Sequence, residues 1–169
     1  MKESELIMEC VWSSTWQKNG ESGSYAQYFV KNDGGRIKAG FKGDTGDCVT
    51  RSIAIASGRP YREVYDALNE LAKRERIGKR KKSKSNSRTG VYRSTYEKYI
   101  KSIGGEWVAT MKIGQGCKVH LRGDELPKGR LVVKVTKHLT AMIDGVIHDT
   151  HDPSRVGERC VYGYYIFNQ

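Results

Sequence analysis

The sequence has no long apolar run, no basic-then-apolar leader and no closely paired cysteines. No window approaches the 18 apolar residues that a membrane-spanning helix needs, so no membrane partner is expected. The N-terminus, MKESELIMEC, carries acids where a secretory signal peptide needs a basic stretch. We therefore expect a cytoplasmic protein.

The four cysteines are widely and irregularly spaced, with no CxxC pair. They are Cys10, Cys48, Cys117 and Cys160. Because thiols stay reduced in the cytosol, we expect core residues, ligands or nucleophiles rather than disulfides.

One segment carries most of the net charge. Residues 73–88 hold nine basic residues against the single acid Glu75, a net of +8, whereas the whole chain is +11. Its part from 77 to 90, rich in Lys, Ser and Gly, is typical of a mobile basic loop. An acidic protein or peptide is the partner we expect at this loop, and nucleic acid bound through Lys79–Lys84 is the alternative.

The 169 residues suit a single domain, 1–169, that is large enough to bury a core without a disulfide or a metal. No cofactor is expected. Apolar spacing and turn residues predict helices followed by strands, which favours an α+β fold. A hairpin is predicted over 25–41, turning at Gly34-Gly35. The first predicted helix begins at residue 48 and ends at Gly58, and the other two span 61–76 and 93–103. The strands predicted after this hairpin are 107–111, 130–135, 138–143, 146–150 and 160–167.

Cys48 is the candidate nucleophile. It follows the glycine-rich stretch Gly40–Gly46, and Asp47 is a good N-cap for a helix that begins at Cys48. The first turn of a helix favours a thiolate through its unpaired N–H groups and partial positive charge. Arg51, one turn on, is expected to lower the pKa of Cys48, and Asp47 to oppose this. The alternative is an ordinary buried cysteine.

His138 is the candidate base. Asp144-Gly145 predicts a type I′ turn, so 138–143 and 146–151 form an antiparallel hairpin in which Ile143 faces Val146. This register makes His138 and Asp149 diagonal neighbours on one face, where Asp149 would orient the imidazole. A bulge or a longer loop would bring Asp152 opposite His138 instead, so Asp152 is the alternative third member.

The order of these residues resembles papain-like cysteine peptidases: a cysteine opening the first main helix, a histidine beginning a strand, and an acid on the next strand. The His138–Pro153 run looks most like the bacteriocin-processing and transglutaminase-like branches. More of the chain, from Gly34-Gly35-Arg36 to Cys160-Val-Tyr-Gly-Tyr164, looks like uncharacterised proteins of bacteria and their phages.

This resemblance implies helices that come first and pack on a C-terminal antiparallel sheet. It also implies a thiol hydrolase or transferase acting on a peptide, isopeptide or related acyl bond in a bacterial or phage-infected cell. In one respect the sequence departs from the pattern, because no Gln or Asn lies just before Cys48 to complete an oxyanion hole. Thr45, Lys42, Gln17 and Gln27 are the candidate substitutes, alongside the Cys48 N–H.

Two other functions compete with this one. Cys117, His120, His148 and His151 are zinc-ligand types, but His148 and His151 would point to opposite faces of a strand, so no metal site is expected. A non-catalytic module of the same fold would use the basic loop to bind nucleic acid or an acidic protein.

Overall fold

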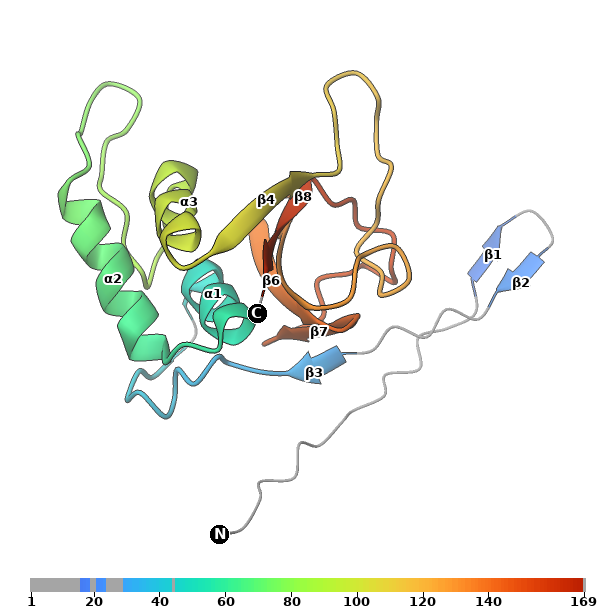
Figure 1. Ribbon diagram of the computed structural model, residues 1–169, viewed down its shortest axis with the longest axis horizontal. Coiled ribbons are helices and arrows are strands. Elements are labelled where there is room, and N and C mark those ends of the chain that lie inside the picture. Colours follow the sequence, from blue (N-terminus) through green and yellow to red (C-terminus); the bar gives the residue numbers. More distant parts are fainter. Residues whose placement is uncertain (1–15, 19–20, 24–28, 44, 169) are drawn as a thin grey trace, which may run out of the picture.

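The computed structural model describes residues 16–18, 21–23, 29–43 and 45–168 (Figure 1). Within these ranges three helices pack beside a six-stranded mixed sheet with the strand order β3-β7-β6-β5-β8-β4, so the predicted α+β class is confirmed. The helices are α1 (Cys48–Ser57), α2 (Tyr61–Lys73) and α3 (Arg93–Ser102). The strands of this sheet are β3 (Phe29–Lys31), β4 (Gly105–Ala109), β5 (Arg130–Val135), β6 (His138–Ile143), β7 (Val146–Asp149) and β8 (Gly163–Phe167). Strands β1 (Trp16–Lys18) and β2 (Glu21–Gly23) form a separate two-stranded antiparallel sheet.

The predicted hairpin over 25–41 is wrong in its second half. Strand β3 pairs parallel with β7, which makes the sheet mixed rather than antiparallel. Residues 34–40 form turns because the side chain of Asp33 accepts hydrogen bonds from the backbone N–H groups of Gly35 and Ile37. Such local bonds offer the backbone an alternative to a strand ladder. Residues 25–28 of the predicted hairpin lie outside the described residues.

The two faces of the sheet are covered differently. Helices α1, α2 and α3 pack on one face, where Ile53, Leu68 and Ile100 meet Val132 and Tyr165. The other face carries a second apolar cluster. Two of its members, Leu121 and Leu126, come from the connection between β4 and β5. This cluster includes Leu121, Leu126, Leu131, Val133, Met142, Ile147 and Val161. Helix α1 lies directly on β6, and this contact sets its first residue against the start of that strand.

Cys117 and Cys160 form a disulfide, so the expectation that these cysteines stay unpaired is wrong. Backbone hydrogen bonds from Leu121 to Arg159 and from Val161 to Val119 hold the two segments side by side. The Cα atoms of Cys117 and Cys160 are therefore 5.8 Å apart, although the two cysteines are 43 positions apart in the sequence. This distance is within the range that a disulfide requires.

The basic loop is anchored to the helices by one carboxylate. Glu75 accepts hydrogen bonds from the N–H and hydroxyl of Ser85 and from the hydroxyl of Thr95, and pairs with Lys81. Burial alone would raise the pKa of Glu75, but these bonds outweigh burial and hold it at about 2. Ser87 is also tied, through its N–H, to the side chain of Asn69. Beyond these anchors, most of the loop's cations are exposed: Lys79, Arg80, Lys82 and Lys84.

Among the described residues, no helix combines the length and the apolar character needed to cross a membrane.

Candidate active site

Cys48 is the first residue of α1, as predicted. The helix behind it is anchored firmly, because every residue from Val49 to Ala56 is buried and Gly58 ends the helix in the left-handed conformation. Cys48 itself is partly exposed, so its thiol is held on a rigid element at the edge of solvent. This placement favours a reactive cysteine over an inert core residue.

Asp47 lies at the N-cap position, but its side chain makes no capping hydrogen bond. Its carboxylate points inward, where it contacts the guanidinium groups of Arg51 and Arg36 and accepts a hydrogen bond from the Tyr61 hydroxyl at 2.7 Å. The prediction of a capping side chain is therefore wrong, because these buried partners hold the carboxylate instead. As a result, the side chain of Asp47 leaves the N–H groups of the first helical turn uncapped beside Cys48.

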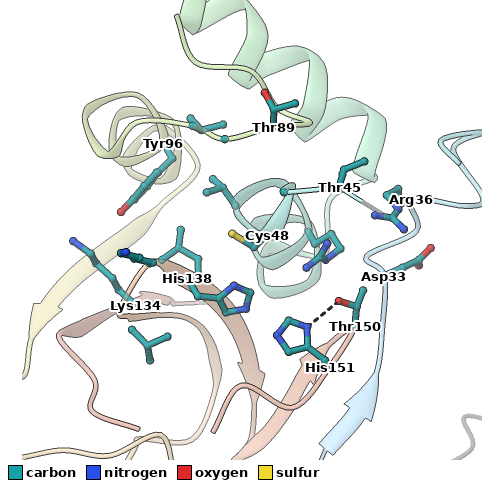
Figure 2. A pocket seen from close by; sticks show the side chains of 18 of the residues that line it. Asp33, Arg36, Thr45, Cys48, Thr89, Tyr96, Lys134, His138, Thr150 and His151 are labelled. Carbon is teal, nitrogen blue, oxygen red and sulfur yellow. Dashed lines mark hydrogen bonds between the residues drawn. The ribbon is translucent and has the colours of Figure 1, made fainter. Parts of the chain in front are cut away.

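His138 and Asp149 meet as the hairpin register predicts. Ile143 pairs with Val146 across β6 and β7, and both turn residues, Asp144 (φ 49°) and Gly145 (φ 85°), adopt the positive φ of a type I′ turn. His138 Nε2 lies 2.7 Å from Asp149 Oδ2. Since this contact occupies Nε2, Nδ1 is the ring nitrogen left to interact with Cys48, and Figure 2 shows the two side chains near each other in the cleft.

The second carboxylate oxygen of Asp149, which does not contact His138, is held by two groups that the sequence did not indicate. Arg51 Nη2 donates to Asp149 Oδ1 at 3.2 Å, and the Thr150 N–H donates to the same oxygen at 2.7 Å. Arg51 thus links Asp47 to Asp149. The i,i+4 spacing of Asp47 and Arg51 could have indicated the contact between these two residues. Nothing local indicated the contact between Arg51 and Asp149, which are 98 residues apart.

The environment shifts the pKa values of Cys48 and His138 in opposite directions. Burial alone would raise the pKa of Cys48, but a hydrogen bond with His138, one from the Leu139 N–H, and the positive charges of His138 and Arg51 together lower it. Burial would lower the pKa of His138, but hydrogen bonds with Asp149 and Cys48 outweigh it and raise this pKa to about 9. The two shifts favour a thiolate–imidazolium pair at neutral pH.

The pKa of Asp149 lies below its usual range, as a charged partner of this pair requires. Burial opposes ionisation, but the hydrogen bond and positive charge of His138 and the Thr150 N–H outweigh it. The carboxylate is therefore ionised and stabilises the protonated imidazole.

Cys48 and His138 line a cleft of about 1150 Å³. Figure 2 shows Tyr96 and Lys134 on one side of the sulfur, and Asp33 and Arg36 on the other. A space of this size accommodates several residues of a peptide or a comparable acyl compound. Thr89 and Gly90, which end the basic loop, also line the cleft with Val91, but Lys79–Lys84 do not.

The candidate oxyanion donors have different positions. Thr45 lines the cleft, and its hydroxyl is buried with no hydrogen-bond partner among the described residues. Lys42 is exposed, and its carbonyl accepts a hydrogen bond from Arg88. Gln17 lies in β1, and Gln27 lies outside the described residues. The backbone N–H of Cys48 and the side chain of Thr45 are thus the candidates that border the cleft.

The remaining candidate residues lie apart from the Cys48–His138–Asp149 site. Asp152 is exposed and accepts a hydrogen bond from the Ser154 N–H at 2.9 Å, so Asp149 rather than Asp152 is the acid in contact with His138.

The four residues of the zinc alternative have different partners. His120 contacts Glu125, His148 contacts Asn32, the His151 ring lies 5.4 Å from that of His138, and Cys117 is in the disulfide. Within the described part of the chain, no group of three or more potential ligands could hold a metal ion.

Comparisons with known proteins add no assignment. No protein-family model matches the chain, and searches among curated proteins and among solved structures gave no match either.

Proposed function

We propose that this protein is a papain-like cysteine hydrolase or transferase that acts on a peptide, isopeptide or related acyl bond. The observation that carries the proposal is the continuous chain of contacts from Cys48 through His138 to Asp149 at the wall of an open cleft. A cysteine, a base within hydrogen-bond reach and a third group that orients the base are the arrangement that nucleophilic catalysis requires. The α+β fold, with the cysteine opening a central helix, is compatible with a papain-like enzyme.

In the proposed reaction the thiolate of Cys48 attacks the carbonyl carbon of the substrate and forms a C–S bond. The carbonyl electrons move to the oxygen, where the uncapped N–H groups at the start of α1 stabilise the negative charge. Thr45 is the side chain at the cleft that we assign as the candidate second donor, in place of the upstream Gln or Asn.

Collapse of this intermediate breaks the bond to the leaving group, which takes a proton from His138 Nδ1. The acyl group remains on Cys48 as a thioester, and the imidazole is neutral. Neutral His138 then removes a proton from water or from an acceptor amine, which attacks the thioester and regenerates the thiolate–imidazolium pair. Asp149 holds the ring in one orientation through both steps.

An activated ester tests this proposal without knowledge of the natural substrate. Mixing the protein with p-nitrophenyl acetate at pH 7 is expected to release a burst of p-nitrophenol. The burst should be close to one equivalent per protein, with an acetyl adduct at Cys48 that hydroxylamine removes. Stopped-flow absorbance measures the burst, and peptide mass spectrometry locates the adduct. A burst of equal size in the Cys48→Ala variant would overturn the proposal.

A further inference from the structure

The arginines that line the cleft have acidic partners. Arg51 pairs with Asp47 and Asp149, and Arg36 pairs with Asp47. Arg93 is at the start of α3, and its Nη2 atom lies 3.7 Å from Glu97 Oε1. The positive charges of these arginines are therefore partly balanced within the site.

Three lysines of the cleft lining make no ion pair within the described residues: Lys31, Lys134 and Lys137. Among the described residues, the lining contains one acid, Asp33, which already accepts hydrogen bonds from backbone N–H groups. The cleft thus carries a surplus of positive charge next to the thiol, and a partly enclosed cleft concentrates such a field.

Lys134 lies in the same cleft lining as Cys48 and His138 (Figure 2). It lies on β5 directly opposite Leu139 of β6, whose N–H helps to lower the pKa of Cys48. Paired residues of adjacent antiparallel strands are about 5 Å apart at their Cα atoms. Lys134 also lies two residues after Val132, on the face of the sheet that carries the helices.

The surroundings of Lys134 suit an anion. Its side chain is half-buried in the cleft wall, and within the described residues its ammonium makes no hydrogen bond. Burial, followed by the nearby positive charge of Arg93, lowers the pKa of Lys134, whereas Glu97 opposes this effect. A bound carboxylate would relieve the repulsion between the two cations and replace the water that Lys134 loses by burial.

We propose that Lys134 forms a subsite for a carboxylate of the substrate, close to the carbonyl that Cys48 attacks. The inference rests on the proposed acyl-transfer function and names its substrate class: acyl compounds or peptides with a carboxylate next to the reacting bond. The exposed cations Lys79–Lys84 do not contribute to this subsite, because none of them lines the cleft.

Two maleimides that differ in charge test the subsite independently of turnover. N-ethylmaleimide is neutral and 3-maleimidopropionate carries a carboxylate, and both alkylate a thiolate. Cys48 is expected to react about 10- to 100-fold faster with the anionic reagent than with the neutral one, because the free energy of a hydrogen bond to a charged group corresponds to a factor of about this size. The ratio of the two rates is first divided by the same ratio measured for free cysteine. The ratio of the two rates cancels any change in the thiolate fraction.

The variant Lys134→Met keeps the length of the side chain and removes its charge. It is expected to reduce the preference for the anionic reagent to about twofold or less, whereas Lys134→Glu should reverse it. Lys82→Met, an exposed lysine of the basic loop, is the matched control and should leave the ratio unchanged. An unchanged ratio in Lys134→Met overturns the subsite.

The neutral reagent separates this failure from a failure of the proposed function. If N-ethylmaleimide modifies Cys48 no faster than a free thiol at pH 6, the activated nucleophile itself is refuted. If the neutral reagent reacts fast but the wild-type protein shows no preference for the anionic reagent, only the carboxylate subsite is refuted.

A pair of esters and a pair of thioesters show whether the carboxylate belongs to the acyl group or to the leaving group of the substrate. N-acetyl-glutamyl and N-acetyl-glutaminyl p-nitrophenyl esters place the difference in the acyl group, and thioesters of a cysteine-containing dipeptide with a free or amidated C-terminus place it in the leaving group. A preference in either pair for the acid, measured as kcat/KM and lost in Lys134→Met, supports the subsite and names the side of the bond. Equal rates in both pairs contradict it.

Discussion

At pH 6 the variant His138→Ala is expected to alkylate at Cys48 with iodoacetamide about 10²-fold more slowly than the wild-type protein. A thiol with the ordinary pKa of about 8.5 is only ~0.3% thiolate at this pH. In the wild-type protein the hydrogen bond and charge of His138 help to lower the pKa of Cys48, so the variant loses much of its thiolate. Rates measured by mass spectrometry of the Cys48 peptide check this result.

His151→Ala is the matched control for that variant. The ring of His151 also lines the cleft, 5.4 Å from that of His138, but within the described residues His151 is not among the groups that shift the pKa of Cys48. We expect its alkylation rate to lie within a factor of about three of wild type, since a distant imidazole perturbs the thiolate only weakly. Equal effects of the two substitutions would show that Cys48 has no specific partner.

Asp47→Ala is expected to destabilise the protein by about 3–5 kcal/mol, because it removes one partner of a buried ion pair. The carboxylate of Asp47 is fully buried and is shared by Arg36, Arg51 and Tyr61. Without it, the remaining acidic partner of Arg51 among the described residues is Asp149, at 3.2 Å. Equilibrium unfolding in urea, followed by circular dichroism, measures the change in the free energy of unfolding.

The exposed pair of Asp124 and Arg122 provides the control for stability. The side chain of Asp124 is 61% exposed, so Asp124→Ala should cost less than about 1 kcal/mol. A loss of this small size in Asp47→Ala would mean that the buried network does not hold the start of α1, and the support we assign to Cys48 would be wrong.

The hairpin of the site was predictable because its signal is local. Asp144-Gly145 fixes a two-residue turn, and counting outward from it places Asp149 diagonally opposite His138, as the structure has it. The start of α1 at Cys48 was predictable for a similar reason, since a glycine-rich stretch precedes an apolar helical stripe.

The remaining features depend on contacts between distant parts of the chain. The pairing of β3 with β7, the disulfide between Cys117 and Cys160, and the bond from Arg51 to Asp149 each join segments that no local pattern relates. Asp47 shows the same limit at a single residue: its type suits an N-cap, but three buried partners hold its side chain elsewhere. The subsite that we propose at Lys134 could not be predicted from the sequence, because it depends on which residue Lys134 faces across β5 and β6.

The pH dependence of Cys48 alkylation by iodoacetamide, measured from pH 4 to 11 on the wild-type protein, tests the thiolate–imidazolium pair most directly. Because the pKa of Cys48 is lowered and that of His138 is raised to about 9, we predict a rate that rises well below pH 8.5 and stays high through neutral pH. A second change is expected near pH 9, where His138 loses its proton. A single rise with a midpoint near pH 8.5, unaltered in His138→Ala, would contradict the pair and the acyl-transfer function built on it.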